Sequence, residues 1–261
     1  MSAARLFLVG GALSYRALFA WLTPGLFAAT MIITPVGQIL FFALLGPALT
    51  ARPATFFVLG GAVQACAMAG VHGMLQGVSG ERQAGTLPVL VTSPASRTAL
   101  WLGRTAPHVA NGVLVSVVGL AFGAAVLGVR VPTAAWLPLA VALLTSVVSC
   151  TALGLLLGAV GLVHRDTPFV ANLVYLALLL VTGATVPVEQ LPAALRAGAP
   201  FVPLPGGIAA VRAAAAHGAT AVWRAAVLHE AAVAAVCLVA GLTSLRALEH
   251  VARRTGGLEL Y

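Results

Sequence analysis

Chemically active side chains are rare in this sequence, and several of them lie in one polar segment, residues 79–97. Glu81 and Arg82 stand side by side in it, and Gly80 and Gly85 are expected to loosen the backbone around them. Long uncharged stretches precede and follow the segment. A charged segment between apolar stretches is where a membrane protein can contact a soluble partner. Its expected chemistry is therefore recognition of another protein.

The second half of the polar segment has the pattern of a short helix. Thr86 is a suitable N-cap, and Pro94 would end the helix. Leu87 and Leu90 are spaced three residues apart and form, with Val91, one apolar ridge. An apolar ridge flanked by charges suits docking into a groove on a partner. The alternative is an ordinary surface loop packed on its own helix bundle.

Residue types argue against other kinds of chemistry. All fourteen cationic side chains are arginine, so the chain lacks the lysine that a P-loop places on ATP phosphates and the lysine that forms Schiff bases. The sequence contains no HExxH motif and no recognisable Ser/His/Asp arrangement. We therefore expect no enzymatic activity and no cofactor in this chain. The arginines are spread along the sequence, which favours membrane orientation over nucleic-acid binding.

Composition predicts an integral membrane protein. Hydrophobic residues form 61% of the chain and charged residues only 8%, whereas soluble domains carry about 25% charged residues. Long apolar runs cross a bilayer as helices, because their backbone groups must be paired internally. We expect one all-α membrane domain over residues 1–261. Its six transmembrane helices are predicted at residues 21–47, 54–79, 106–128, 134–163, 168–187 and 226–246.

Two further segments are expected at the membrane surface. Residues 1–20 carry Arg5 and Arg16 on one helical face, which is typical of an interfacial helix. Residues 188–224 are interrupted by prolines and arginines, and we expect them to form a re-entrant or interfacial helical cap between spans five and six. A seventh full span is the alternative for this segment.

Arginine counts predict the orientation in the cell membrane. Nine of the fourteen arginines would lie on the side that holds both termini and residues 79–97, and five on the other side. Cytoplasmic segments carry the excess of basic residues. We therefore expect both termini and the polar segment in the cytoplasm, and the cap outside.

Two sets of residues resemble a known family. The first is the run Glu81-Arg82-x-x-Gly85-Thr86-Leu87-x-x-Leu90 with Ser93-Pro94 and Arg97, and the second comprises Asn172, Gly183, Pro187, Leu191-Pro192, Pro200, Pro203-Leu204 and Arg212. They are similar to the cytoplasmic loop and the span-five-to-cap region of type 2 ABC transporter permeases, in particular daunorubicin-resistance-like exporters. The chain departs from that pattern at Gln83 and Pro88, where family loops often carry acidic residues.

The resemblance implies a membrane subunit that exports a hydrophobic or amphipathic, drug-like compound. Two permease subunits, expected to be identical, would associate with two copies of a separate ATPase subunit that binds ATP and magnesium. The polar segment would be the coupling helix, with Glu81, Arg82, Gly85, Thr86, Leu87, Leu90 and Pro94 as its site residues. A glycolipid or polysaccharide cargo is one alternative. A membrane sensor or scaffold without transport is another.

Polar residues within the predicted spans form stripes. We expect two of these stripes to line a central pathway, through Gln64, Met68 and His72 in span two and Asn172, Tyr175 and Thr182 in span five. The alternative is hydrogen bonding between helices of one subunit. Glu230 is expected to be an interfacial or cap-contacting residue, and a gating role is the alternative. Gly-xxx-Gly pairs indicate close helix packing, at Gly73/Gly77, Gly119/Gly123 and Gly154/Gly158.

Overall fold

The computed structural model describes residues 25, 29–83, 85–86, 97–162 and 166–255. Every regular element in these ranges is helical. The α-helices are α3 (Thr34–Thr50), α4 (Ala54–Ala67), α5 (Gly73–Gln83), α7 (Arg97–Leu127), α8 (Trp136–Gly161), α9 (Thr167–Val181), α10 (Ala193–Gly198), α11 (Pro205–His217) and α12 (Ala221–Thr255). Single π-helical turns precede α3 and α5, at Ala29–Ile33 and Met68–His72. Short 3-10 turns are found at Thr133–Ala135, Val188–Gln190 and Ala199–Phe201.

Four helical segments are long and apolar enough to cross a membrane. They are Ala54–Glu81, Thr98–Leu127, Thr133–Gly161 and Ala221–Leu248, each of 28 to 30 residues, whereas a span needs about 20. They correspond to predicted spans two, three, four and six. Helices α3 and α9 have 17 and 15 residues. Spans one and five therefore stay predictions, as does the total of six. The expected interfacial helix at residues 1–20 lies outside the described residues.

Several predicted boundaries were wrong. The second helix continues to Gln83, so residues 79–83 belong to α5 and not to a loop. Helix α9 ends at Val181, six residues before the predicted end of span five. Gly183 then adopts a left-handed φ of +82°, which turns the chain out of the helical path. The last helix begins at Ala221, inside the segment predicted to be cap.

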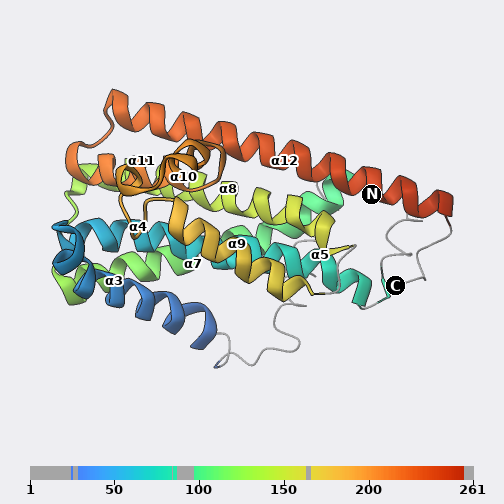
Figure 1. Cartoon of the computed structure of the whole chain (residues 1–261), viewed down its shortest axis with the longest axis horizontal. Helices are drawn as coiled ribbons and strands as arrows, with labels where there is room; N and C mark the ends of the chain where they lie inside the picture. Colours follow the sequence, from blue (N-terminus) through green and yellow to red (C-terminus); the bar gives the residue numbers. More distant parts are fainter. Residues whose placement is uncertain (1–24, 26–28, 84, 87–96, 163–165, 256–261) are drawn as a thin grey trace.

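The bundle is held by close helix contacts. Helix α8 runs along α12, and α4 lies between α3, α7 and α8 (Figure 1). The predicted glycine pairs lie at these contacts: His108 packs over Gly73 and Gly77, and Val78 packs over Gly158. The backbone oxygen of Gly70 occupies the place that a Cβ of Gly154 would need. Small residues thus let the backbones approach.

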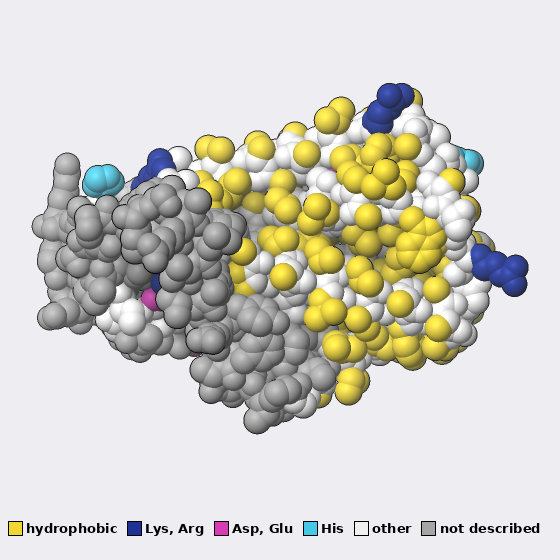
Figure 2. Space-filling view, turned by 180° about the vertical axis from the view of Figure 1, so that it is seen from behind, with side chains coloured by type: hydrophobic (Ala, Val, Ile, Leu, Met, Phe, Trp, Pro, Cys, Tyr) yellow, Lys and Arg dark blue, Asp and Glu magenta, His cyan; other side chains and the backbone are white. Residues whose placement is uncertain are grey.

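Apolar side chains cover much of the outer surface. On one face of the molecule, hydrophobic side chains extend over the described middle of the bundle, while arginine side chains lie at its edge (Figure 2). Large exposed apolar residues include Leu137, Phe169 and Val222. An apolar belt between charged rims is what a lipid bilayer requires of a helical protein. The chain is therefore a multi-pass membrane protein.

The segment after α9 is irregular. Ala193–Phe201 and Pro205–His217 form a pair of helices that are bent by 83° to each other. A re-entrant or interfacial cap was expected here, with a seventh full span as the alternative. A bent pair fits either a re-entrant segment or one broken span, so the cap stays a prediction. Helices α10 and α11 lie at the end of the bundle where α4 begins, and the end of α5 lies at the opposite end (Figure 1). The polar segment therefore starts on the face opposite the cap.

Candidate functional site

The last turn of α5 ends in a defined turn. The N–H of Thr86 donates to the backbone oxygen of Glu81 at 3.0 Å, and Gly85 between them has a φ of +66°. A left-handed glycine followed by this six-residue closure is the Schellman arrangement that satisfies the carbonyls at a helix end. Residue 85 is exposed, and no atom would lie within 4 Å of an added Cβ. Glycine is thus required here for its backbone conformation and not for space.

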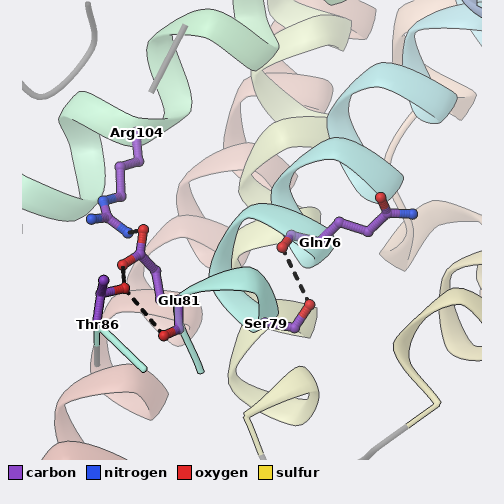
Figure 3. A network of polar contacts seen from close by, with 5 residues as sticks. All are labelled: Gln76, Ser79, Glu81, Thr86 and Arg104. Carbon is purple, nitrogen blue, oxygen red and sulfur yellow. Dashed lines mark hydrogen bonds and ion pairs between the residues drawn. The ribbon is translucent and has the colours of Figure 1, made fainter. Parts of the chain in front are cut away.

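The carboxylate of Glu81 connects this turn to the neighbouring helix (Figure 3). One oxygen, Oε2, accepts a hydrogen bond from the Thr86 hydroxyl, and the other, Oε1, forms an ion pair with Nη1 of Arg104 on α7. The Arg104 guanidinium lies 5.4 Å from the ring centre of Trp101, one turn earlier on α7. The side chains of Arg104 and Glu81 are 17% and 22% exposed. Glu81, Thr86 and Arg104 are called the polar clamp below.

The polar clamp contains two of the predicted coupling residues, Glu81 and Thr86. A third, Gly85, lies in the turn between them. The backbone of Arg82 belongs to α5. The other predicted coupling residues, Leu87, Leu90 and Pro94, lie outside the described residues. Gly85 does not loosen the chain as expected but fixes the end of α5. Thr86 closes α5, and its predicted role as an N-cap concerns residues beyond the described turn.

Arg104 was not identified by sequence reasoning as part of the site. It stands 23 residues after Glu81 and on another helix, and no spacing rule joins the two positions. The only signal would have been its position. It lies seven residues after Arg97, in the first turns of an apolar helix that follows the polar segment in the sequence.

The predicted pathway residues of spans two and five meet one another. Nε2 of His72 lies 3.1 Å from Oδ1 of Asn172, and the rings of His72 and Tyr175 pack edge to face at 5.8 Å. The Thr182 hydroxyl donates to Oε1 of Gln64 at 3.0 Å. The two stripes therefore face each other within one chain.

These contacts fit the alternative of hydrogen bonding between helices of one subunit. The Tyr175 hydroxyl donates to Oε1 of Gln38 on α3 at 2.5 Å, which extends the set to a third helix. Gln64 is buried and Met68 half-buried, whereas Asn172 is exposed. The side chain of Asn172 is therefore accessible to a transport pathway, and the role of the stripes in lining one stays a prediction.

Glu230 contacts the cap, as expected. Its side chain is fully buried, with 0% exposure. Oε1 accepts from the N–H of Leu204 at 2.9 Å, and Oε2 accepts from the N–H of Gly207 at 3.0 Å. These are free N–H groups at the start of α11, where a negative charge is favoured. Leu204 has a φ of +89°, a strained value for a residue with a side chain.

Arg212 holds α11 on its other side. Its Nη2 donates to the backbone oxygen of Phe56 at 3.0 Å and approaches that of Ala184 at 3.4 Å. Its guanidinium lies 3.4 Å from the centre of the Phe56 ring. Arg212 therefore ties α11 to the start of α4 and to the turn after α9.

No metal site is built by the described residues. Among them, no three His, Cys, Asp or Glu side chains come together in a group that could hold a metal ion. Cys66 and Cys150 approach to 3.7 Å between sulfurs, but both are buried among apolar side chains of α4 and α8. All three cysteines, Cys66, Cys150 and Cys237, are free and buried.

Comparison with known proteins identifies the family. Residues 12–215 match the family model described as ABC-2 type transporter. The matched range includes the polar segment, the polar clamp, the two stripes and most of α11. No curated protein matches the chain.

Proposed function

This chain belongs to the ABC-2 type transporter family, and we propose that it is the membrane subunit of an ATP-driven exporter. Family membership makes it a component of a transporter whose membrane subunit is not itself the catalyst. The proposed cargo is a hydrophobic or amphipathic, drug-like compound, as in the daunorubicin-resistance-like exporters that its sequence resembles. The proposed site is the cell membrane, with both termini in the cytoplasm.

The observation that carries the proposal is the polar clamp at the start of residues 79–97. An ATPase outside the membrane can move the spans only through a segment that is rigidly joined to them. Here the end of α5 is closed by Gly85 and Thr86 and joined to α7 by Arg104. A push on the segment would therefore reach two spans at once.

The proposed partner is a separate ATPase subunit in two copies. The chain has no lysine with which to build a P-loop, so ATP and magnesium would bind to that partner. A second, identical permease subunit would complete the pathway. The stripes on Gln64, Met68, His72, Asn172, Tyr175 and Thr182 are proposed to line it where they are reached by water.

Two experiments test this function: copurification of the chain with an ATPase, and transport by the reconstituted complex. The chain, tagged and extracted from its native membrane in mild detergent, should retain an ATPase chain that contains a Walker A lysine. The complex in proteoliposomes should move a fluorescent hydrophobic amine only when ATP is present. Failure to retain any ATPase would reject the exporter. Transport of a glycolipid instead of the amine would correct the cargo.

A further inference from the structure

We propose that Arg104 is a positioning residue for coupling, and that Glu81 acts through Arg104 instead of contacting the ATPase directly. The inference rests on the proposed function, because it assigns a mechanical role to the polar clamp within an exporter. In this proposal Glu81 does not contact the ATPase but forms an ion pair with Arg104 within its own chain.

Both oxygens of the Glu81 carboxylate are already engaged. Oε2 accepts from Thr86, and Oε1 pairs with Arg104. The two partners come from different directions, one from the turn and one from α7 (Figure 3). A carboxylate held this way offers no uncompensated charge to a partner. A direct ion pair with the ATPase would first require the loss of one of these contacts.

Arg104 is well placed to serve as a fixed anchor. Its guanidinium lies against the ring of Trp101, which is 2% exposed and packs with Met74, Val78, Leu155 and Leu245. A guanidinium within about 6 Å of an aromatic ring centre is attracted to the ring face, which favours one position of the long arginine side chain. The anchor is thus connected to the core cluster that joins α5, α8 and α12.

Glu81 is the one acidic residue of residues 79–97. Acids that family loops often carry are replaced by Gln83 and Pro88, so no second carboxylate in this segment can substitute for it. If the one acid is used inside the chain, the ATPase recognises the segment by shape and by other groups. The polar clamp then fixes the turn Gly85–Thr86 with which α5 ends.

A double-mutant cycle tests the inference. The variants are Glu81→Gln, Arg104→Gln and the double variant, with Arg104→Lys as the conservative change. Arg130→Gln, an exposed arginine beyond the other end of α7, is the control. The measured quantity is the amount of amine moved per ATP hydrolysed by the reconstituted complex. Each single variant should lower this ratio about 3- to 10-fold, and the double variant should be no worse than the lower single variant.

Two results would overturn the inference. Effects that multiply in the double variant would show that Glu81 and Arg104 act separately. A ratio for Arg104→Gln equal to that of Arg130→Gln, while Glu81→Gln uncouples, would place the contact of Glu81 elsewhere. Arg104→Lys should keep at least half of the wild-type ratio, since an ammonium can still pair with the carboxylate; a loss equal to that of Arg104→Gln would contradict the ion pair.

A second measurement does not depend on the ATPase. Trypsin cleaves after arginine, so Arg82 and Arg97 report on access to the segment in the purified chain. Glu81→Gln and Arg104→Gln should each speed this cleavage several-fold, the double variant by the same factor, and Arg130→Gln not at all. Unchanged cleavage in both single variants would refute the polar clamp. Faster cleavage in a chain that retains no ATPase would instead keep the clamp and reject the exporter.

Discussion

Replacing Glu230 should destabilise the junction between α11 and α12 more than any change of an exposed acid. Glu230→Ala removes two hydrogen bonds to a charged acceptor and leaves the buried N–H groups of Leu204 and Gly207 without it. Each such bond contributes about 1.5–3 kcal/mol, so the loss should be about 3–5 kcal/mol after partial relaxation. Glu230→Gln keeps one acceptor oxygen and turns an amide group toward the other donor. Its cost should be roughly half.

The buried cysteines provide the assay. Cys66 and Cys150 are 0% exposed and Cys237 is 7% exposed, so a thiol-reactive dye reports unfolding without any added label. At about 2–4 °C per kcal/mol for a chain of this size, Glu230→Ala should lower the apparent midpoint by about 6–20 °C. Unfolding of membrane proteins is often irreversible, so all variants must be heated at one rate.

The matched control is Glu189→Gln, an exposed acid in the turn Val188–Gln190. It should leave the midpoint within about 2 °C of wild type, since exposed substitutions cost within about 0.5 kcal/mol. The order of midpoints should be wild type and Glu189→Gln, then Glu230→Gln, then Glu230→Ala. If Glu230→Ala melts together with Glu189→Gln, the carboxylate does not anchor α11 and the reasoning fails.

Two more predictions concern packing and the pathway. Gly154→Ala should cost about 1–3 kcal/mol, because a Cβ there would collide with the Gly70 oxygen and lie 2.8 Å from Cβ of Met74. The control Gly37→Ala, where no atom lies within 4 Å of the added Cβ, should be neutral or slightly stabilising in the same dye assay. Equal unfolding midpoints for the two variants would contradict the close contact at Gly154. Asn172→Cys, in a chain whose native cysteines are replaced by alanine, should react with a water-soluble thiol reagent. Leu180→Cys, exposed on the same helix, should not react; equal labelling of the two would exclude a pathway confined to the polar face.

Hydropathy predicted the long spans because their composition is decisive. The four segments of 28 to 30 residues have mean hydropathies of 1.7 to 2.2. It failed at the end of α9, where the apolar run continues through Val186 but the backbone turns at Gly183. Apolarity does not distinguish a helix from a buried turn. The break depends on a left-handed glycine and on the contact of Ala184 with Arg212.

The motif predicted where the site begins but not how it is built. Glu81, Gly85 and Thr86 could be selected from their types and spacing. Their geometry could not, because a Schellman turn and an N-cap place the same residue types at similar positions. Arg104 is reached only through the packing of α7 on α5. In the same way, the stripe that begins at Gln64 on α4 continues into the π turn Met68–His72, which a regular helical period does not anticipate.

The charged groups at the two ends of this bundle share one structural use. Glu81 joins the turn at Gly85 to α7, while Glu230 and Arg212 join α11 to α12 and α4. Irregular segments such as the turn at Gly85 and the start of α11 cannot be fixed by apolar burial alone, because lipid and helix surfaces are equally apolar. Charges are costly in this setting unless they are paired, so they are used where irregular backbone must be held. Glycine contacts fix the spans permanently, whereas single polar contacts can be exchanged during a transport cycle. Variants of the glycines should therefore change stability first, and variants of the polar clamp should change coupling first.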